Sequence, residues 1–164
     1  MNLQIKKISK DNFFKYGQLI STKNIESQNI NEETTKSFYD LVNIEIYGDD
    51  KKCRVNIFKS IKRNLPLEIN MLENHPLSSQ AFIPLQKTKF IVVVAPISKE
   101  PDINLLEAFH ISHDEGINFK PKVWHFPLIA TENSNFLTID KKDSANNLAI
   151  YNFQNNDKIF LHYE

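Results

Sequence analysis

The stretch AFIPLQKTKFIVVVAPI, residues 81–97, decides the fold class of this chain. It holds two apolar runs of strand length, 81–85 and 90–97, separated by the polar connection 86–89. β-branched and aromatic side chains, which favour strands, are frequent in both runs. The uninterrupted apolar run 90–95 predicts a strand that is buried on both faces.

Apolar runs of similar length recur on both sides of this stretch, and Pro, Asn, Asp or Gly separates most of them. They are residues 41–47, 53–58, 123–130, 136–139 and 148–153. So many short strands at short spacing predict a mainly β protein, built as an antiparallel barrel or sandwich.

Three segments depart from this strand pattern. The string SKDNFFKYG, residues 9–17, predicts a short N-terminal helix with Ser9 as its N-cap and Gly17 as its C′ glycine. Residues 101–109 place apolar side chains at helical spacing after a proline, which predicts a helical turn. Residues 24–36 are polar and poor in apolar anchors, so we expect a loop or a flap there.

Length and composition bound the function. A chain of 164 residues with 41% hydrophobic and 24% charged residues fits one folded domain, residues 1–164. Its 20 basic residues balance 20 acidic ones, which indicates a small-molecule ligand and no nucleic-acid or membrane partner. The N-terminus lacks the apolar segment of a signal peptide, so we expect a cytoplasmic protein. The single cysteine, Cys53, excludes an intramolecular disulfide and a site of several thiolates.

The string ENHPLSSQAFIPL, residues 73–85, is the first candidate for chemistry. It places polar side chains just ahead of an apolar strand, and strand alternation aims Ser79 and Gln80 in opposite directions. A polar loop of this kind can bring His75 and Gln80 to the mouth of a barrel. The alternative is structural, with His75 capping a turn and Gln80 satisfying backbone groups.

The string GINFKPKVWHFPL, residues 116–128, is the second candidate. Its glycine, proline and Val-Trp-His run resemble the second motif of cupin barrels, in which the histidine points into the barrel. His125 is therefore a candidate inward imidazole. The alternative is a satisfied core histidine beside a core Trp124.

Metal and nucleotide chemistry find little support in the sequence. Many cupins hold a divalent ion with a His-x-His pair and a glutamate, and no His-x-His occurs here. His110 and His113 are three residues apart and would face opposite sides of a strand. We therefore expect no metal and no other cofactor. Three glycines cannot form a phosphate loop, and Cys53 lies in an apolar strand without an evident base.

The two polar strings resemble the ureidoglycolate lyase family, also called ureidoglycolate hydrolase, and the resemblance extends from Leu3 to about Ser144. It is most specific at HPLSSQAFIP, residues 75–84. Further matches are Tyr16-Gly17, Asp40-Leu41 with Glu45, Leu65-Pro66, Val92-Val93-Val94, Val123-Trp124-His125 with Pro127, and the FLTID string, residues 136–140.

The resemblance implies a homodimeric, cytosolic, cupin-like antiparallel β-barrel or jelly roll that cleaves (S)-ureidoglycolate to glyoxylate and urea. For this elimination we expect a base to take the hydroxyl proton and an acid to protonate the departing urea. The expected catalytic residues are His75, His125 and Gln80. The expected substrate-binding residues are Asn31, Ser79, Lys59, Lys120 and Lys141.

The chain departs from the family where arginines are common, and it carries Ser37, Lys59 and Lys141 at those positions. One explanation is compositional drift, because the chain is rich in Lys, Asn and Ile and has only Arg54 and Arg63. The other is a changed carboxylate grip, since lysine lacks the bidentate fork of arginine. Two alternatives therefore remain: a diverged cupin that handles another small ureido acid or carboxylate without ureidoglycolate turnover, and a metal-dependent cupin with an unrelated substrate.

Overall fold

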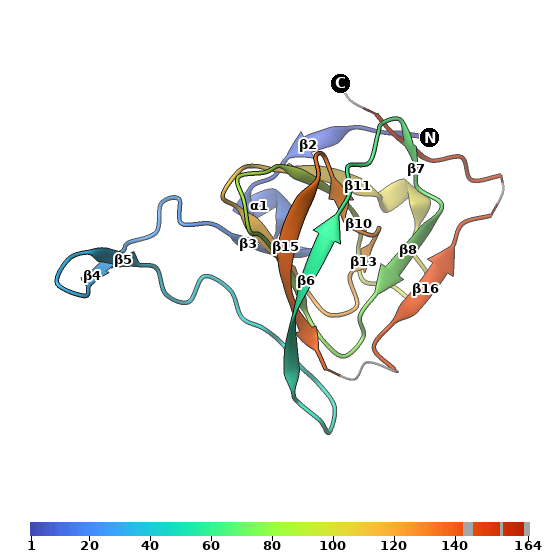
Figure 1. Cartoon of the computed structure of the whole chain (residues 1–164). Helices are drawn as coiled ribbons and strands as arrows, with labels where there is room; N and C mark the ends of the chain where they lie inside the picture. The colour runs from blue at the N-terminus through green and yellow to red at the C-terminus, as the bar shows by residue number, and fades with distance from the viewer. Residues whose placement is uncertain (143–145, 155, 163–164) are drawn as a thin grey trace.

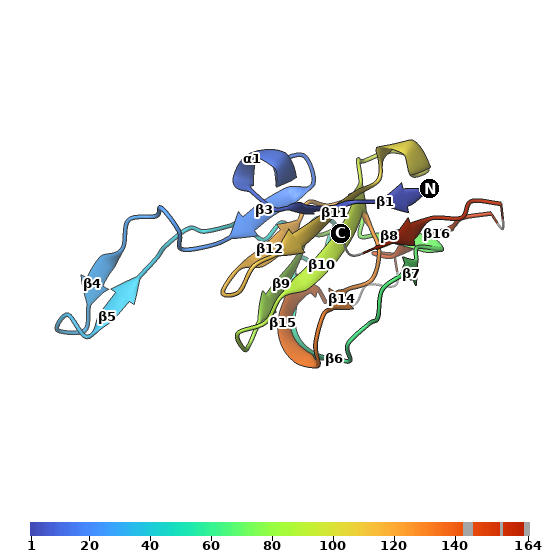
Figure 2. The same ribbon diagram turned by 90° about the horizontal axis from the view of Figure 1, so that it is seen from above.

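Most regular structure is β-strand in the computed structural model, which describes residues 1–142, 146–154 and 156–162. A five-stranded sheet has the order β3-β12-β9-β15-β6 (Figure 2). Its strands are β3 (Gly17–Ile20), β6 (Cys53–Ser60), β9 (Gln80–Pro84), β12 (Gly116–Phe119) and β15 (Ser134–Lys141). Every neighbouring pair within it is antiparallel.

A seven-stranded sheet faces it, with the order β16-β8-β13-β10-β11-β2 and β14 paired to β10. Its strands are β2 (Ile5–Lys7), β8 (Met71–Asn74), β10 (Phe90–Ala95), β11 (Glu107–Ile111), β13 (Trp124–His125), β14 (Ile129–Ala130) and β16 (Ala149–Asn152). Three short strands form a further sheet with the order β1-β17-β7. They are β1 (Asn2–Leu3), β7 (Leu67–Glu68) and β17 (Phe160–Leu161). This mainly β, cupin-like sandwich confirms the predicted fold class.

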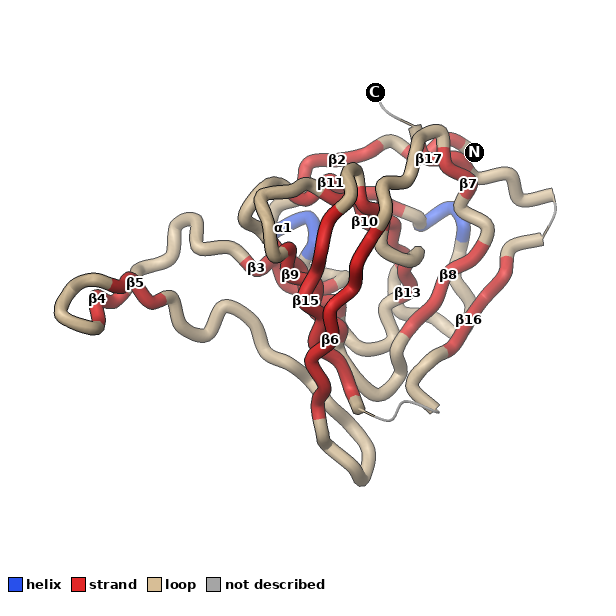
Figure 3. The backbone as a smooth tube through the Cα atoms, viewed as in Figure 1, coloured by secondary structure: helices blue, strands red, loops and turns tan. Residues whose placement is uncertain are grey.

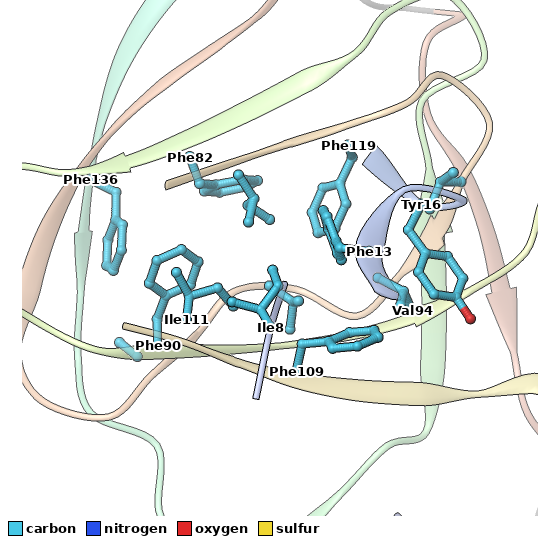
Figure 4. Close-up of a cluster of buried hydrophobic side chains, with 14 residues drawn as sticks. Ile8, Phe13, Tyr16, Phe82, Phe90, Val94, Phe109, Ile111, Phe119 and Phe136 are labelled. Carbon is cyan, nitrogen blue, oxygen red and sulfur yellow. The ribbon is translucent and has the colours of Figure 1, made fainter. Parts of the chain in front are cut away.

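Strand β10 is buried along its whole length, as predicted for residues 90–95. Phe90, Val92 and Val94 join the aromatic-rich core between the two large sheets (Figure 4). Ile91 and Val93 face the second core, on the other side of the seven-stranded sheet. Alternation along one strand thus anchors two hydrophobic clusters.

The helix is shorter than predicted. Ser9 is the N-cap of α1 (Lys10–Phe13), as expected, and it also forms a capping box with Asn12. Gly17 is no C′ residue, because Phe14 ends the helix and Gly17 begins β3. A Cβ at Gly17 would lie 2.3 Å from the Asn118 carbonyl oxygen, so the close approach of β3 to β12 requires glycine.

Several apolar runs fold differently from the expectation. Residues 41–47 form one isolated bridge, Ile46 to Ser78, and otherwise lie extended without strand pairing. The run 123–130 divides into β13 and β14, because Pro127 cannot donate to a ladder. The turn expected at 101–109 is the short 3₁₀ helix η1 (Ile103–Leu105), after which β11 begins.

Residues 24–38, which we call the arm, project from the body of the molecule (Figures 1 and 2). The arm is a hairpin of β4 (Gln28–Ile30) and β5 (Thr35–Ser37), where a loop or flap was expected. It covers no part of its own sandwich, as the backbone trace in Figure 3 shows. No helix in the described part of the chain is long and apolar enough to cross a membrane.

Candidate active site

A cavity of about 400 Å³ is lined from both large sheets. The five-stranded sheet contributes β6, β9 and β15, and the seven-stranded sheet contributes β8. The lining residues are Arg54, Phe58, Ser60, Glu73, His75, Gln80, Phe82, Pro127, Leu128, Asp140 and Leu148. His125 on β13 does not line the cavity itself but packs against His75, with ring centroids 5.3 Å apart. The structure therefore brings His75, His125 and Gln80 together, as the sequence predicts.

A backbone carbonyl determines the tautomer of each of the two imidazoles. Nδ1 of His75 lies 2.7 Å from the Asn147 oxygen, and Nδ1 of His125 lies 3.0 Å from the Val123 oxygen. A carbonyl oxygen only accepts, so each Nδ1 donates and each neutral ring presents a lone pair at Nε2. Both Nε2 atoms are buried and have no hydrogen-bond partner among the described residues.

His125 is held as a neutral base. Burial, and to a smaller extent the nearby His75, lower the pKa of His125 to about 3. The ring also stacks on Phe119, with centroids 4.4 Å apart and planes inclined by 14°. The Nε2 of His125 lies 3.6 Å from Glu73 Oε1, but with so low a pKa this contact is no ion pair at neutral pH.

Glu73 places a carboxyl group against both imidazoles. It comes from β8, whose Cα register pairs it with His125 on β13. Burial raises the pKa of Glu73, while the electrostatic interaction with His75 lowers it by a smaller amount. The net rise means that Glu73 holds a proton more readily than an exposed glutamate does.

The opposite wall of the cavity is a chain of charge-assisted contacts. The Nε of Arg54 donates to Asp140 Oδ1 at 2.6 Å, and Nη2 donates to Oδ2 at 3.3 Å. Gln80 Nε2 also donates to Asp140 Oδ2, at 3.5 Å. This pairing orients the guanidinium and the carboxamide along the cavity wall. The Oε1 atom of Gln80 is buried without a partner among the described residues.

Three donor groups could hold a metal ion. Ligand atoms of Glu73, His75 and His125 all lie within 4.8 Å of one another. Two neutral imidazole nitrogens and a carboxylate suit a divalent cation, so these residues fit such an ion. We expected no metal because the sequence has no His-x-His pair. The cluster supplies a ligand set of another kind, so the absence of a metal stays a prediction.

The expected lysines do not reach the cavity. Arg54, Phe58 and Ser60 line it from β6, so alternation turns Lys59 to the outer face of the sheet. Lys141 follows the inward Asp140 on β15, and its Nζ donates to the Asp50 carbonyl.

Lys120 belongs to a different cavity, of about 740 Å³ and without either imidazole. Its Nζ donates to the Phe14 carbonyl at 2.6 Å and lies over the Phe14 ring. We assign the chemistry to the smaller cavity, because His75 and Gln80 line it and the His125 ring packs against His75.

Two expected hydrogen-bonding residues also lie elsewhere. Ser79 Oγ accepts from the Glu45 backbone N–H at 2.9 Å, so it fastens the extended segment 41–47 to the sheet. Asn31 is at the tip of the arm with a positive φ of 52°. Ser37, one of the positions where the sequence departs from the family resemblance, lies on β5 of the same arm.

Arg54, Glu73 and Asp140 are the site residues that the sequence reasoning missed. Glu73 belongs to the quoted string 73–85, and Asp140 to the family match at 136–140. Arg54 could have been found as one of only two arginines in the chain, on a predicted strand. Its inward direction depends on the register of β6 against β15, which pairs Arg54 with Asp140.

The fold and the cavity define a cupin-like β-sandwich protein with an imidazole- and carboxylate-lined pocket between its sheets. The model of the ureidoglycolate lyase family matches residues 1–160. The ureidoglycolate lyase of Pseudomonas putida is 34% identical over 160 residues, which cover 97% of this chain and 96% of that protein. Its counterpart from Pseudomonas syringae pv. tomato is 36% identical, with coverage of 97% and 94%. The chain belongs to the ureidoglycolate lyase family, a family of carbon–nitrogen lyases.

Proposed function

We propose that this chain cleaves (S)-ureidoglycolate to glyoxylate and urea by an acid- and base-assisted elimination. One observation carries the proposal: three buried acceptors, Nε2 of His75, Nε2 of His125 and Oε1 of Gln80, lack partners among the described residues, with His75 and Gln80 lining one pocket and His125 packed against His75. Buried acceptors without donors are costly. The hydroxyl and ureido N–H groups of ureidoglycolate are donors of the kind that would satisfy them.

In the proposed mechanism His75 moves the proton. Its Nε2 lone pair takes the substrate hydroxyl proton as the C–N bond breaks and the aldehyde of glyoxylate forms. The same nitrogen then delivers this proton to the departing urea nitrogen, so the reaction needs no net proton. His125, with its low pKa, stays neutral and accepts a hydrogen bond that orients the substrate.

Arg54 is the group that we assign to the substrate carboxylate. It is the only lysine or arginine among the described residues that line the pocket. A guanidinium has several donors in a rigid fork, so a ligand carboxylate can join the contacts it already makes. Asp140 serves as the positioning residue that keeps this fork in place.

The direct test is a turnover assay with purified protein and (S)-ureidoglycolate, following glyoxylate release. His75→Ala should lower kcat by about 10²–10⁴-fold, the usual contribution of a positioned acid–base group. His162→Ala, outside the pocket, is the matched control and should leave kcat unchanged. Binding of a ureido acid without turnover by the unmutated protein would favour the diverged-cupin alternative.

The cluster of Glu73, His75 and His125 supports a second candidate, a metal-dependent cupin. A divalent cation, when bound, would act there as a Lewis acid on a substrate oxygen. Elemental analysis together with a chelator separates the two candidates. Activity that survives complete metal removal supports proton transfer by the imidazoles alone. About one metal per chain, with activity lost on chelation, supports the second candidate.

A further inference from the structure

The arm is an element without a partner in its own fold. Its strands β4 and β5 pair only with each other among the described strands. No arm residue belongs to either hydrophobic core. An isolated two-stranded hairpin is marginal in water, so its structure needs support from a further surface.

The five-stranded sheet ends in an equally incomplete element. β6 is its last strand, and one edge of β6 has no neighbouring strand in the described part of the chain. The outward Val55 and Ile57 on β6 are 61% and 52% exposed. Long apolar edge strands invite pairing with another chain. The arm of the same copy leaves from β3, at the opposite edge of this sheet.

Within the described residues, each copy therefore has one hairpin without a supporting surface and one strand edge without a neighbouring strand. In a two-fold dimer the arm of each copy can pair with the β6 edge of the other copy. Both arms and both edges then have partners, and the assembly is closed. A strand added beside β6 would lie at the rim of the pocket, because Arg54 and Phe58 of β6 line it.

We propose that the arm of one copy pairs along the β6 edge of a second copy and closes over that copy's pocket. Each active site is then built from two chains, which goes beyond dimerisation as such. The pocket itself offers the carboxyl groups of Glu73 and Asp140 against a single described cation, Arg54. Lys36 on β5 is the only cation between residues 24 and 38, so it is the arm's contribution to anion binding. Only this role of Lys36 rests on the proposed function.

A shortened arm tests the proposal. The register pairs Gln28 with Ser37, so residues 27 and 38 follow as the next opposed pair. Replacing residues 28–37 by Asn-Gly joins residues 27 and 38 through a two-residue turn. We expect the shortened chain to keep its thermal unfolding transition but to sediment as a monomer where the unmutated chain is a dimer. Amide hydrogens of 53–60 should also exchange faster in the shortened chain. A shortened chain that remains dimeric with unchanged exchange would overturn the proposal.

Complementation tests the shared site. His75→Ala chains and shortened chains carry different affinity tags and are co-purified as heterodimers. Each parent should be inactive, whereas the heterodimer has one complete site and should reach about half the activity of the unmutated dimer. An inactive heterodimer, alongside an active unmutated protein, would refute shared sites. If the unmutated protein has no turnover, the proposed function fails, while sedimentation and exchange still decide the arm exchange.

Lys36 has its own readout. Lys36→Ala should raise KM about tenfold or more with a smaller effect on kcat, and Lys36→Arg should retain a KM near that of the unmutated protein. Lys87→Ala, in the exposed connection between β9 and β10, is the matched control. An unchanged KM in Lys36→Ala would remove Lys36 from the site.

Discussion

At the scale of single residues, side-chain direction decides which residues line the pocket and which of their sequence neighbours do not. Asp140 lines the pocket, whereas Lys141, one position later, bonds the Asp50 carbonyl. Arg54 and Lys59 lie an odd number of positions apart on β6, so their side chains point to opposite faces. Proximity in sequence to a site residue is therefore a poor guide to membership of the site.

The two arginines give a matched pair for the carboxylate contact. Arg54→Ala should lower kcat/KM by about 10- to 150-fold, the equivalent of one charge-assisted hydrogen bond. Arg63→Ala removes an equal side chain that lies over the Phe126 ring outside the pocket, and kcat/KM should change little. Equal losses in the two variants would contradict the assignment of Arg54.

The buried His125 predicts acid-sensitive folding. Its pKa is lowered from 6.5 to about 3. Between pH 6.5 and pH 3, His125 is therefore protonated in the unfolded chain and neutral in the folded chain. The resulting stability is complete above about pH 6.5 and falls by about 1.4 kcal/mol per pH unit as the pH drops toward 3.

His125→Phe should flatten this dependence in urea unfolding measured between pH 4.5 and 7. Glu73 and His75 face His125, and both remain in the variant, so the difference between the two proteins isolates His125. Parallel pH profiles for the two proteins would show that His125 is protonated in the folded state.

At the scale of elements, strand spacing constrains residues that carry no chemistry. β3 approaches β12 so closely that only a hydrogen fits at Gly17. Gly48 is the other instructive glycine, since its φ of +89° favours glycine although a Cβ there would meet no atom within 4 Å.

Comparing these two glycines separates steric conflict from backbone strain. Gly17→Ala should cost about 2–3 kcal/mol, because the neighbouring backbone cannot move without breaking the β3–β12 ladder. Gly48→Ala should cost about 1 kcal/mol from backbone conformation alone. Thermal unfolding of both variants measures the two losses of stability. A larger loss of stability in Gly48→Ala than in Gly17→Ala would contradict the argument from strand spacing.

At the scale of the whole molecule, the pocket joins the two large sheets. Glu73 comes from the seven-stranded sheet, while Gln80 and Asp140 come from the five-stranded sheet. A ligand that contacts both walls adds contacts between the sheets and stabilises the sandwich through binding to the folded state alone.

Ureidoacetate, which lacks the reactive hydroxyl, should show this stabilisation without turnover. At about one hundred times its Kd it should add about 2.7 kcal/mol, or a rise in Tm of roughly 5–10 °C. Gln80→Ala should reduce the shift, whereas Arg63→Ala should preserve it. A ligand-independent Tm in the unmutated protein would contradict recognition of a ureido acid.

Local pattern determined much of this protein. The burial of β10 follows from an uninterrupted apolar run, and the capping box at Ser9 from residues three apart. The two polar strings with His75, Gln80 and His125 were visible as candidates, and alternation alone predicted that Gln80 points opposite to Ser79. Such features depend on neighbours within a few positions, which the sequence displays directly.

Pairing between distant segments decided the rest. Arg54 meets Asp140 through the β6–β15 register, and Glu73 meets His125 through the pairing of β8 with β13. A shift of one residue in either register would turn these side chains to the other face of the sheet. For this reason Lys59 and Lys141, two of the lysines expected at the anion site, do not line the pocket. Local sequence specifies which residues alternate, but only the packed sheets decide which set faces inward.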